Sequence, residues 1–219
     1  MSINTYILVG LRNPGEEYEL TRHNVGALSL EYCMAQWQKD ARYENVSRKK
    51  SKLYESWTYR YWIRDTTSID ICLVFPATYM NLSGSAVKSF VGTQNDEADK
   101  IGSVWVFHDD IDLMLGSFKI ARNISSAGHK GVQNVIEQLG TKDFVRFRIG
   151  ILPVEGKKTS TDAFVLKKFG KKEREALNSS VFPLICDAIG LAFASGIDRA
   201  QNIFNKRANE KLPGCSLPV

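Results

Sequence analysis

The alternation of short apolar runs with helix-like segments constrains the fold of this chain more than any other feature. Residues 6–10 and 104–107 are apolar runs closed by a glycine or by polar residues, as in buried strands that end in loops. Between them, apolar residues at steps of three and four predict a helix over 24–37, with Asn24 as its N-terminal cap. Interleaved strands and helices predict a single α/β domain, with a mixed, mostly parallel twisted sheet and helices on both faces.

The same patterns predict the remaining elements. Two strand-like runs, 55–63 and 68–75, flank the polar residues 64–67 and predict an antiparallel hairpin. The other expected elements are helices over 86–92, 129–139, 171–194 and 197–206 and strands over 117–122 and 144–151. No repeat or linker divides the chain, so we expect one domain over 1–219 that includes the C-terminal helices 171–206.

The composition is that of an ordinary globular protein with a basic charge balance. Hydrophobic residues make up 43% of the chain and charged residues 24%, which argues against disorder, collagen-like repeats and coiled coils. The net charge of +5 and the pI near 9.0 favour an anionic partner, of which nucleic acid is the commonest.

The cysteines and the apolar runs predict where the protein is found. The four cysteines are Cys33, Cys72, Cys186 and Cys215. They are far apart in sequence and lack metal-ligand spacing, so we expect free thiols in a reducing cytoplasm. No basic stretch leads into a long apolar run at the N-terminus, and the apolar run 188–194 is too short to span a bilayer. We therefore expect a soluble, cytoplasmic protein with no membrane partner.

Polar side chains with catalytic potential follow the predicted strands, where α/β proteins form ligand sites. They are Asn13, His23, Asn81 and Asp109. An imidazole can take a proton from water, and a carboxylate behind it fixes the tautomer and stabilises the imidazolium. Asparagine amides can donate hydrogen bonds to a carbonyl or an oxyanion. The alternative is structural, since a single histidine is more often a surface or core residue and asparagine commonly forms turns.

Seven segments, in unchanged order, resemble motifs of the bacterial-type peptidyl-tRNA hydrolases. The segments are residues 9–15, 21–24, 78–84, 108–112, 127–129, 146–150 and 164–166. They cover roughly residues 6 to 170, and several motifs in register are hard to obtain by chance. On these residues the chain is identified as a member of that family.

The resemblance implies a monomeric enzyme that hydrolyses the ester between a nascent peptide and the terminal ribose of tRNA. It implies no metal and no cofactor, and peptidyl-tRNA from stalled translation as substrate. By the same resemblance His23 is the general base, Asp109 orients it, and Asn13 senses an N-blocked substrate. The other implied substrate-binding residues are Tyr18, Tyr79, Asn81 and Met80, which lies in the cleft wall and for which core packing is the alternative.

The chain departs from the family pattern at three places. Arg12 stands where the family usually has glycine, and residues 123–126 replace a glycine-rich stretch. Lys130 stands where the family has an asparagine that binds substrate and places the water. We expect this lysine to bind substrate, to disfavour the protonated form of His23 by its charge, and so to extend activity to lower pH.

Basic residues on two neighbouring predicted strands are candidates for contacts with tRNA phosphates. Arg146 and Arg148 are two residues apart on a strand and therefore point to one face. Lys119 and Arg122 lie on the neighbouring strand, and Lys130 adds to the same positive surface. The alternative is an ordinary solvated face.

Two other functions compete with this one. A protein of the same fold that binds RNA without hydrolysis is favoured by Lys130 and opposed by the intact set of candidate catalytic residues. A metal-dependent hydrolase would use His108, Asp109, Asp110 and Asp112 as ligands, but adjacent residues at a strand end point in different directions.

Overall fold

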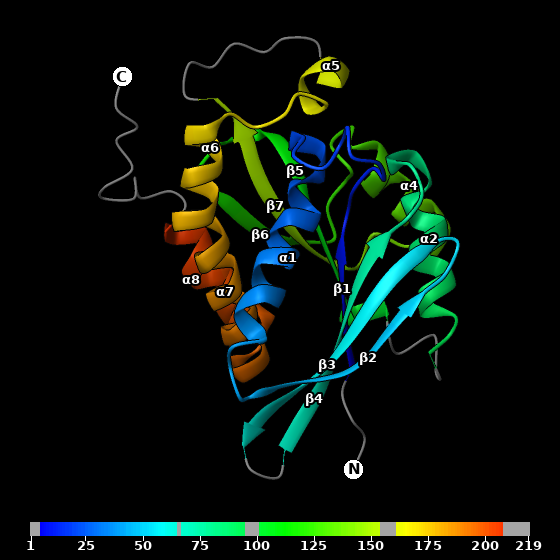
Figure 1. Ribbon diagram of the computed structural model, residues 1–219, viewed down its shortest axis with the longest axis vertical. Helices are drawn as coiled ribbons and strands as arrows, with labels where there is room; N and C mark the ends of the chain where they lie inside the picture. Colours follow the sequence, from blue (N-terminus) through cyan, green and yellow to red (C-terminus); the bar gives the residue numbers. More distant parts are fainter. Residues whose placement is uncertain (1–4, 65–66, 95–100, 154–160, 208–219) are drawn as a thin grey trace.

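One seven-stranded sheet forms the centre of the molecule in the computed structural model, which describes residues 5–64, 67–94, 101–153 and 161–207 (Figure 1). The strand order is β2-β3-β4-β1-β5-β7-β6. The strands are β1 (Thr5–Gly10), β2 (Tyr43–Lys50), β3 (Tyr54–Arg64), β4 (Thr67–Pro76), β5 (Val104–Met114), β6 (Phe118–Arg122) and β7 (Val145–Leu152).

The sheet is parallel in its centre and antiparallel at both edges. β1 pairs in parallel with β4 and β5, and β5 pairs in parallel with β7. The pairs β2–β3, β3–β4 and β6–β7 are antiparallel. The mixed sheet is therefore confirmed, with parallel pairing in the four central strands, and so is the predicted hairpin.

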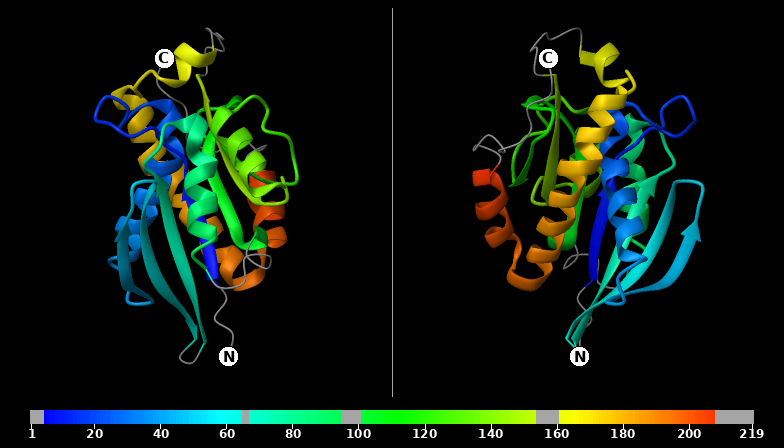
Figure 2. Two further views of the ribbon diagram at one scale, coloured as in Figure 1. Left: turned by 90° about the vertical axis from the view of Figure 1, so that its right-hand side faces the viewer. Right: turned by 60° about the vertical axis from the view of Figure 1, so that its left-hand side comes forward.

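Helices cover both faces of the sheet, as predicted (Figure 2). The helices and helical turns are η1 (Arg22–Asn24), α1 (Val25–Trp37), η2 (Met80–Leu82), α2 (Ser83–Val91), η3 (Ile101–Ser103), α4 (Lys130–Leu139), α5 (Thr161–Val165), α6 (Lys171–Ala176), the π turn η4 (Leu177–Val181), α7 (Phe182–Ser195) and α8 (Ile197–Arg207). Side chains of β1 alternate between two cores: Leu8 packs with α1, α7 and α8, whereas Ile7 and Val9 pack with α2 and α4. The period of two in the apolar run therefore builds both layers.

Three elements differ from the sequence-based expectations. β2 was not predicted, because it is a polar, largely exposed edge strand without alternating apolar residues. The short helix α5 was also not predicted. β5 continues to Met114, so His108, Asp109 and Asp110 lie within a strand and not in the loop after it. The polar residues there keep strand geometry because β5 stays paired with β7 as far as Asp110.

The prediction of four free thiols is wrong for two of them. Cys33 on α1 and Cys186 on α7 form a disulfide across 153 residues of sequence, with their Cα atoms 5.6 Å apart. Cys72 is buried, with its Sγ 3.7 Å from the Thr58 hydroxyl, and Cys215 lies outside the described residues. Sequence spacing could not show the pairing, because it arises only when α1 and α7 pack on the same face of the sheet.

The continuous helix over Lys171–Ser195 is long and apolar enough, by length and composition, to cross a membrane. The apolar run 188–194, which is too short to span a bilayer, is only part of this helix. Leu177, Ile185 and Ile189 of this helix lie in the core beside α1 and the sheet. A helix that packs in a protein core passes the same test, and core packing accounts for the apolar face.

Candidate active site

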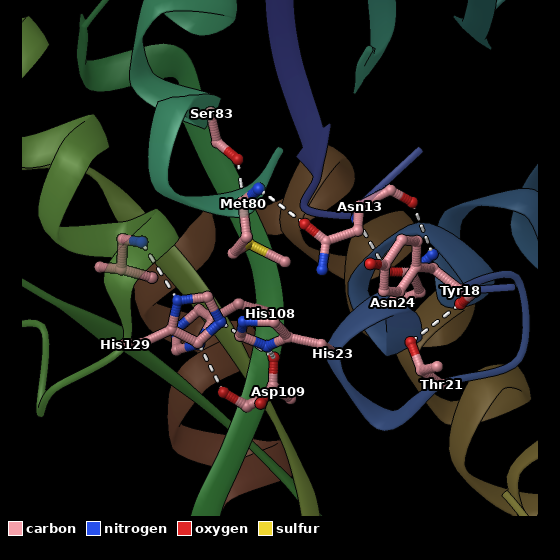
Figure 3. Close-up of polar contacts among 11 residues, drawn as sticks. Asn13, Tyr18, Thr21, His23, Asn24, Met80, Ser83, His108, Asp109 and His129 are labelled. Carbon is pink, nitrogen blue, oxygen red and sulfur yellow. Dashed lines mark hydrogen bonds and ion pairs between the residues drawn. The ribbon is translucent and has the colours of Figure 1, made fainter. Parts of the chain in front are cut away.

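The candidate site lies where β1, β4 and β5 leave their parallel pairing and the chain turns toward η1, η2 and α4 (Figure 3). Gly26, near the start of α1, packs directly on the backbone of β5, because a Cβ there would collide with the carbonyl of Phe107. This contact sets the distance between the turn that carries His23 and the strand that carries Asp109.

Asn13 is held from three sides. Its side-chain oxygen accepts the N–H of Met80 at 2.7 Å, its backbone N–H donates to Asn24 Oδ1 at 2.8 Å, and its carbonyl accepts from Asn24 Nδ2 at 3.0 Å. With Oδ1 occupied, the amide NH₂ of Asn13 points away from Met80, toward the histidines (Figure 3). Asn24 occupies the N-cap position of α1, as predicted, but its side chain forms no capping hydrogen bond because it is bound to the backbone of Asn13.

His23 and His129 share one oxygen of Asp109. His23 Nδ1 lies 2.8 Å and His129 Nε2 lies 2.9 Å from Asp109 Oδ1. An N–H at each of these nitrogens donates to the carboxylate, which leaves Nε2 of His23 with a lone pair. The structure therefore brings together the predicted pair His23 and Asp109, and it adds His129.

The tautomer of His129 follows from its place at the N-cap of α4. His129 Nδ1 accepts the backbone N–H of Val132 at 3.2 Å, so the ring proton must sit on Nε2. His129 is therefore a hydrogen-bond donor to Asp109, and its ring lies 4.8 Å from the ring of His23.

The pKa of the Asp109 carboxyl lies well below its usual range. Burial opposes its ionisation, but the two histidines outweigh burial through their charge interactions and hydrogen bonds. Asp109 is thus a buried, permanently ionised carboxylate that can stabilise an imidazolium at His23.

His108 lies beside this group but is not part of the shared hydrogen bond. Its Nδ1 donates to the carbonyl of Asp109 at 2.7 Å, and its Nε2 is buried without a partner among the described residues. Burial, followed by the proximity of His129, lowers the pKa of His108 well below 6.5, so this ring is neutral.

His23, Asp109 and His129 are the three described residues whose spacing would suit a metal ion, since their ligand atoms lie within 4.8 Å of one another. The hydrogen bonds oppose this use. A metal on Nε2 of His129 would force the ring proton to Nδ1, where it would point at the N–H of Val132. The alternative ligand set around His108 is not assembled either, because Asp110 is paired with Arg148 at 2.6 Å.

A cavity of about 370 Å³ adjoins the shared oxygen. It is lined by His23, His108, Asp109, Asp110, Ile111, Asp112, Ser126, Ala127, Gly128, His129, Lys130, Asp162 and Val165. At its rim Lys130 Nζ pairs with Asp162 Oδ2 at 2.8 Å, and both side chains are exposed. The sequence suggested an unpaired positive charge near His23. In the structure Asp162 compensates the charge of Lys130, so the two residues act on His23 together.

Of the five residues expected to bind substrate, all but Lys130 lie together beyond Asn13. Tyr79 is exposed, and its ring lies 6.4 Å from that of Tyr18 in an edge-to-face arrangement. Asn81 is exposed on η2. Met80 is buried and packs on Gly131, where a Cβ would meet its sulfur. Met80 thus has the packing role that was its alternative, in addition to its N–H bond to Asn13.

The predicted phosphate contact at Arg146 is wrong. The two arginines of β7 do share a face, but Arg146 is buried and donates to the carbonyls of Ile124 and Ser125. Burial, followed by Arg148, lowers the pKa of Arg146 to about 10. Its charge holds the loop before His129.

The other predicted phosphate contacts differ in their availability. Arg148 is paired with Asp110, and Arg122 is paired with Asp143 at 2.7 Å. Lys119 forms no ion pair with a described residue, and it lies beside Arg148 in the β6–β7 register. Of the cations predicted on these two strands, Lys119 is therefore the one that the structure leaves available.

The sequence reasoning missed the roles of three residues. His129 lies in the segment 127–129 that resembles the family, and no role was predicted for it, although its position before α4 marks an N-cap. Asn24 was interpreted as a helix cap. Arg22, buried beside His23, donates to the carbonyls of Lys167 and Lys168 and to Glu173. No local pattern in the sequence indicates that contact across more than 140 residues.

Comparisons with known proteins agree on one family. The family model described as peptidyl-tRNA hydrolase matches residues 7–212. The chain is 38% identical over 205 residues to a peptidyl-tRNA hydrolase of Thermodesulfovibrio yellowstonii, covering 91% of this chain and 98% of the relative. It is 34% identical to that of Synechocystis, covering 92% and 96%. The crystal structure of peptidyl-tRNA hydrolase from Acinetobacter baumannii superposes with a TM-score of 0.73 at 26% identity, covering 93% of this chain and 94% of that one.

Proposed function

The chain belongs to the peptidyl-tRNA hydrolase family, and from that premise we propose that it cleaves the peptide–tRNA ester with His23 as general base and Asp109 as its support. The observation that carries this proposal is the 2.8 Å contact between His23 Nδ1 and Asp109 Oδ1. That contact directs the unprotonated Nε2 away from the carboxylate, so Nε2 is available to accept a proton from water.

Ester hydrolysis can proceed with water and the side chains of this site alone. Nε2 of His23 takes a proton from water as the oxygen attacks the ester carbonyl, and Asp109 stabilises the imidazolium that forms. The tetrahedral intermediate then breaks the bond to the ribose oxygen, and that oxygen receives the proton from His23. The tRNA leaves with a free hydroxyl, and the peptide leaves as a carboxylic acid that loses its remaining proton to solvent. No step of this mechanism uses a metal or a cofactor.

Neighbouring groups supply orientation and polarity. His129 donates to the oxygen that Asp109 offers to His23, which limits rotation of the carboxylate. The NH₂ of Asn13 is held toward the histidines and can donate to the carbonyl of an N-blocked substrate. Asn81 and the tyrosine pair Tyr18 and Tyr79 extend the substrate surface. A monomer, a cytoplasmic location and a single domain over 1–219 complete the proposal. The location now rests on the substrate of translation and not on the cysteines, two of which form a disulfide.

The test uses N-acetylated aminoacyl-tRNA and its unblocked counterpart as substrates. The wild-type protein should release the amino acid from the blocked form alone. His23→Ala should abolish release while deacylated tRNA still binds, because proton transfer and phosphate contact use different groups. Asp109→Asn should lower the rate on the order of a hundredfold or more, since it removes the charge that supports the imidazolium.

Two results would contradict the assignment. Unchanged turnover in His23→Ala would exclude it as the base. A wild-type protein that binds tRNA without releasing the amino acid would favour the RNA-binding alternative.

A further inference from the structure

Four exposed lysines lie in six consecutive residues after α5: Lys167, Lys168, Lys171 and Lys172, here called the lysine patch. None of them forms an ion pair with a carboxylate that the structure describes. Glu173 is committed elsewhere: one oxygen accepts the N–H of Gly170 at 2.7 Å and the other pairs with Arg22 at 2.6 Å. The patch therefore presents its positive charge to solvent.

The lysine patch is bound to the turn that carries His23, here called the catalytic turn (residues 21–24). Thr21 forms a β-bridge with Lys168, and the N–H of Arg22 donates to the carbonyl of Lys167 at 3.1 Å. The Arg22 guanidinium also lies over the rings of Phe164 and Phe169. The lysines thus begin two residues after Val165, which lines the cavity beside His23.

Two of the lysines stand where their charge works against the local structure. Lys171 and Lys172 are the first residues of the helix that begins at α6, and the positive end of a helix dipole disfavours cations there. The same turn holds one acidic residue, Glu173, but its two oxygens are bound to Arg22 and Gly170 and to neither lysine. Residues that break a local rule are expected at functional sites. Glu175 lies one turn after Lys171, and no ion pair joins the two.

We propose that the lysine patch binds phosphates of the tRNA body when the ester end of the same tRNA is in the cleft. The structure favours this surface over the β7 arginines, because Arg146 is buried and Arg148 is paired with Asp110. Phosphate binding also explains cations that are exposed, free of described carboxylates and held beside the catalytic turn. The inference rests on the proposed function for the identity of the RNA, but not on the role of His23.

The test compares two variants that each lose four exposed positive charges. The patch variant replaces Lys167, Lys168, Lys171 and Lys172 with glutamine. The control variant replaces four exposed lysines elsewhere, namely Lys39, Lys49, Lys52 and Lys88. Binding of deacylated tRNA is measured from low to moderate salt for both, with thermal unfolding to confirm that each is folded.

The patch variant should give a shallower plot of log affinity against log salt, by about one unit for each lysine that contacts a phosphate. Its KM for N-acetylated aminoacyl-tRNA should rise while kcat at saturation is unchanged. The control variant should change the slope much less.

Equal slopes in the two variants would overturn the proposal. A slope in the patch variant that equals that of wild type would also overturn it, and this result is expected if the surface binds an acidic protein instead. An inactive wild-type protein would contradict the proposed function. The slope of tRNA affinity against salt would still show whether the lysine patch binds tRNA.

Discussion

The side chain of Asn24 makes a reciprocal pair of hydrogen bonds with the backbone of Asn13, accepting its N–H at 2.8 Å and donating to its carbonyl at 3.0 Å. The pair closes the segment between β1 and α1. It fixes the backbone of the residue whose side chain accepts the N–H of Met80. Asn24 therefore connects the turn after His23 to the substrate side of the cleft.

Replacing Asn24 with alanine should leave two buried backbone groups of Asn13 without partners. The expected loss of unfolding free energy is about 1–3 kcal/mol for each group, and urea unfolding measures it. Activity should also fall, because Asn13 loses its fixed orientation. Asn24→Asp keeps the acceptor but places a second, ionisable oxygen against the buried carbonyl of Asn13. It should therefore destabilise the protein at least as much as alanine at neutral pH. Wild-type stability in both variants would contradict this account.

The pair Lys130–Asp162 should control the acid limb of the pH–rate profile. Asp162 interacts with both Lys130 and His23, and Lys130 holds the pKa of this carboxyl below its usual range. Lys130→Asn leaves an uncompensated anion that favours a protonated His23, so the acid limb should move to higher pH. Asp162→Asn leaves an uncompensated cation and should move the limb to lower pH.

The double variant of these two residues should return close to wild type, since both charges are then absent. The shifts should shrink as salt rises, because exposed charges are screened over about 8 Å at physiological ionic strength. An acid limb that stays in place in both single variants would show that the pair acts on another step.

Arg146→Met should weaken the fold and not the electrostatic part of tRNA binding. It removes the donors of two loop carbonyls, those of Ile124 and Ser125. We expect a loss of about 2 kcal/mol or more in unfolding free energy and lower activity through a displaced His129. The salt slope of tRNA binding should be unchanged, whereas a slope shallower by about one unit would restore Arg146 as a phosphate contact.

Reduction of the Cys33–Cys186 disulfide should lower the stability with little effect on activity at 25 °C. The disulfide closes a loop of 153 residues, for which the chain-entropy model gives about 5 kcal/mol. Urea unfolding with and without dithiothreitol measures the difference, and Cys186→Ser should unfold at the same midpoint in both. Denatured, unreduced protein should show two reactive thiols of the four cysteines; four would contradict the disulfide.

Much of the fold could be predicted from local patterns. The apolar run before Asn13 and the helical spacing after Asn24 are local, so they identified β1 and α1 to within about a residue. The polar edge strand β2 could not be found in this way, because its stability comes from pairing with β3 and not from its own side chains.

By itself, the sequence determined the α/β class and the family, and it predicted His23, Asp109 and Asn13 as site residues, because motifs and hydrophobic periods are properties of neighbouring residues. Tertiary structure alone decided which groups meet. It gave Asp109 a second histidine, took Arg146 into the interior, offset Lys130 with Asp162 and joined Cys33 to Cys186. Each of these contacts joins residues at least 20 positions apart, and the energies of charges and hydrogen bonds depend on distance and burial, which a linear sequence does not contain.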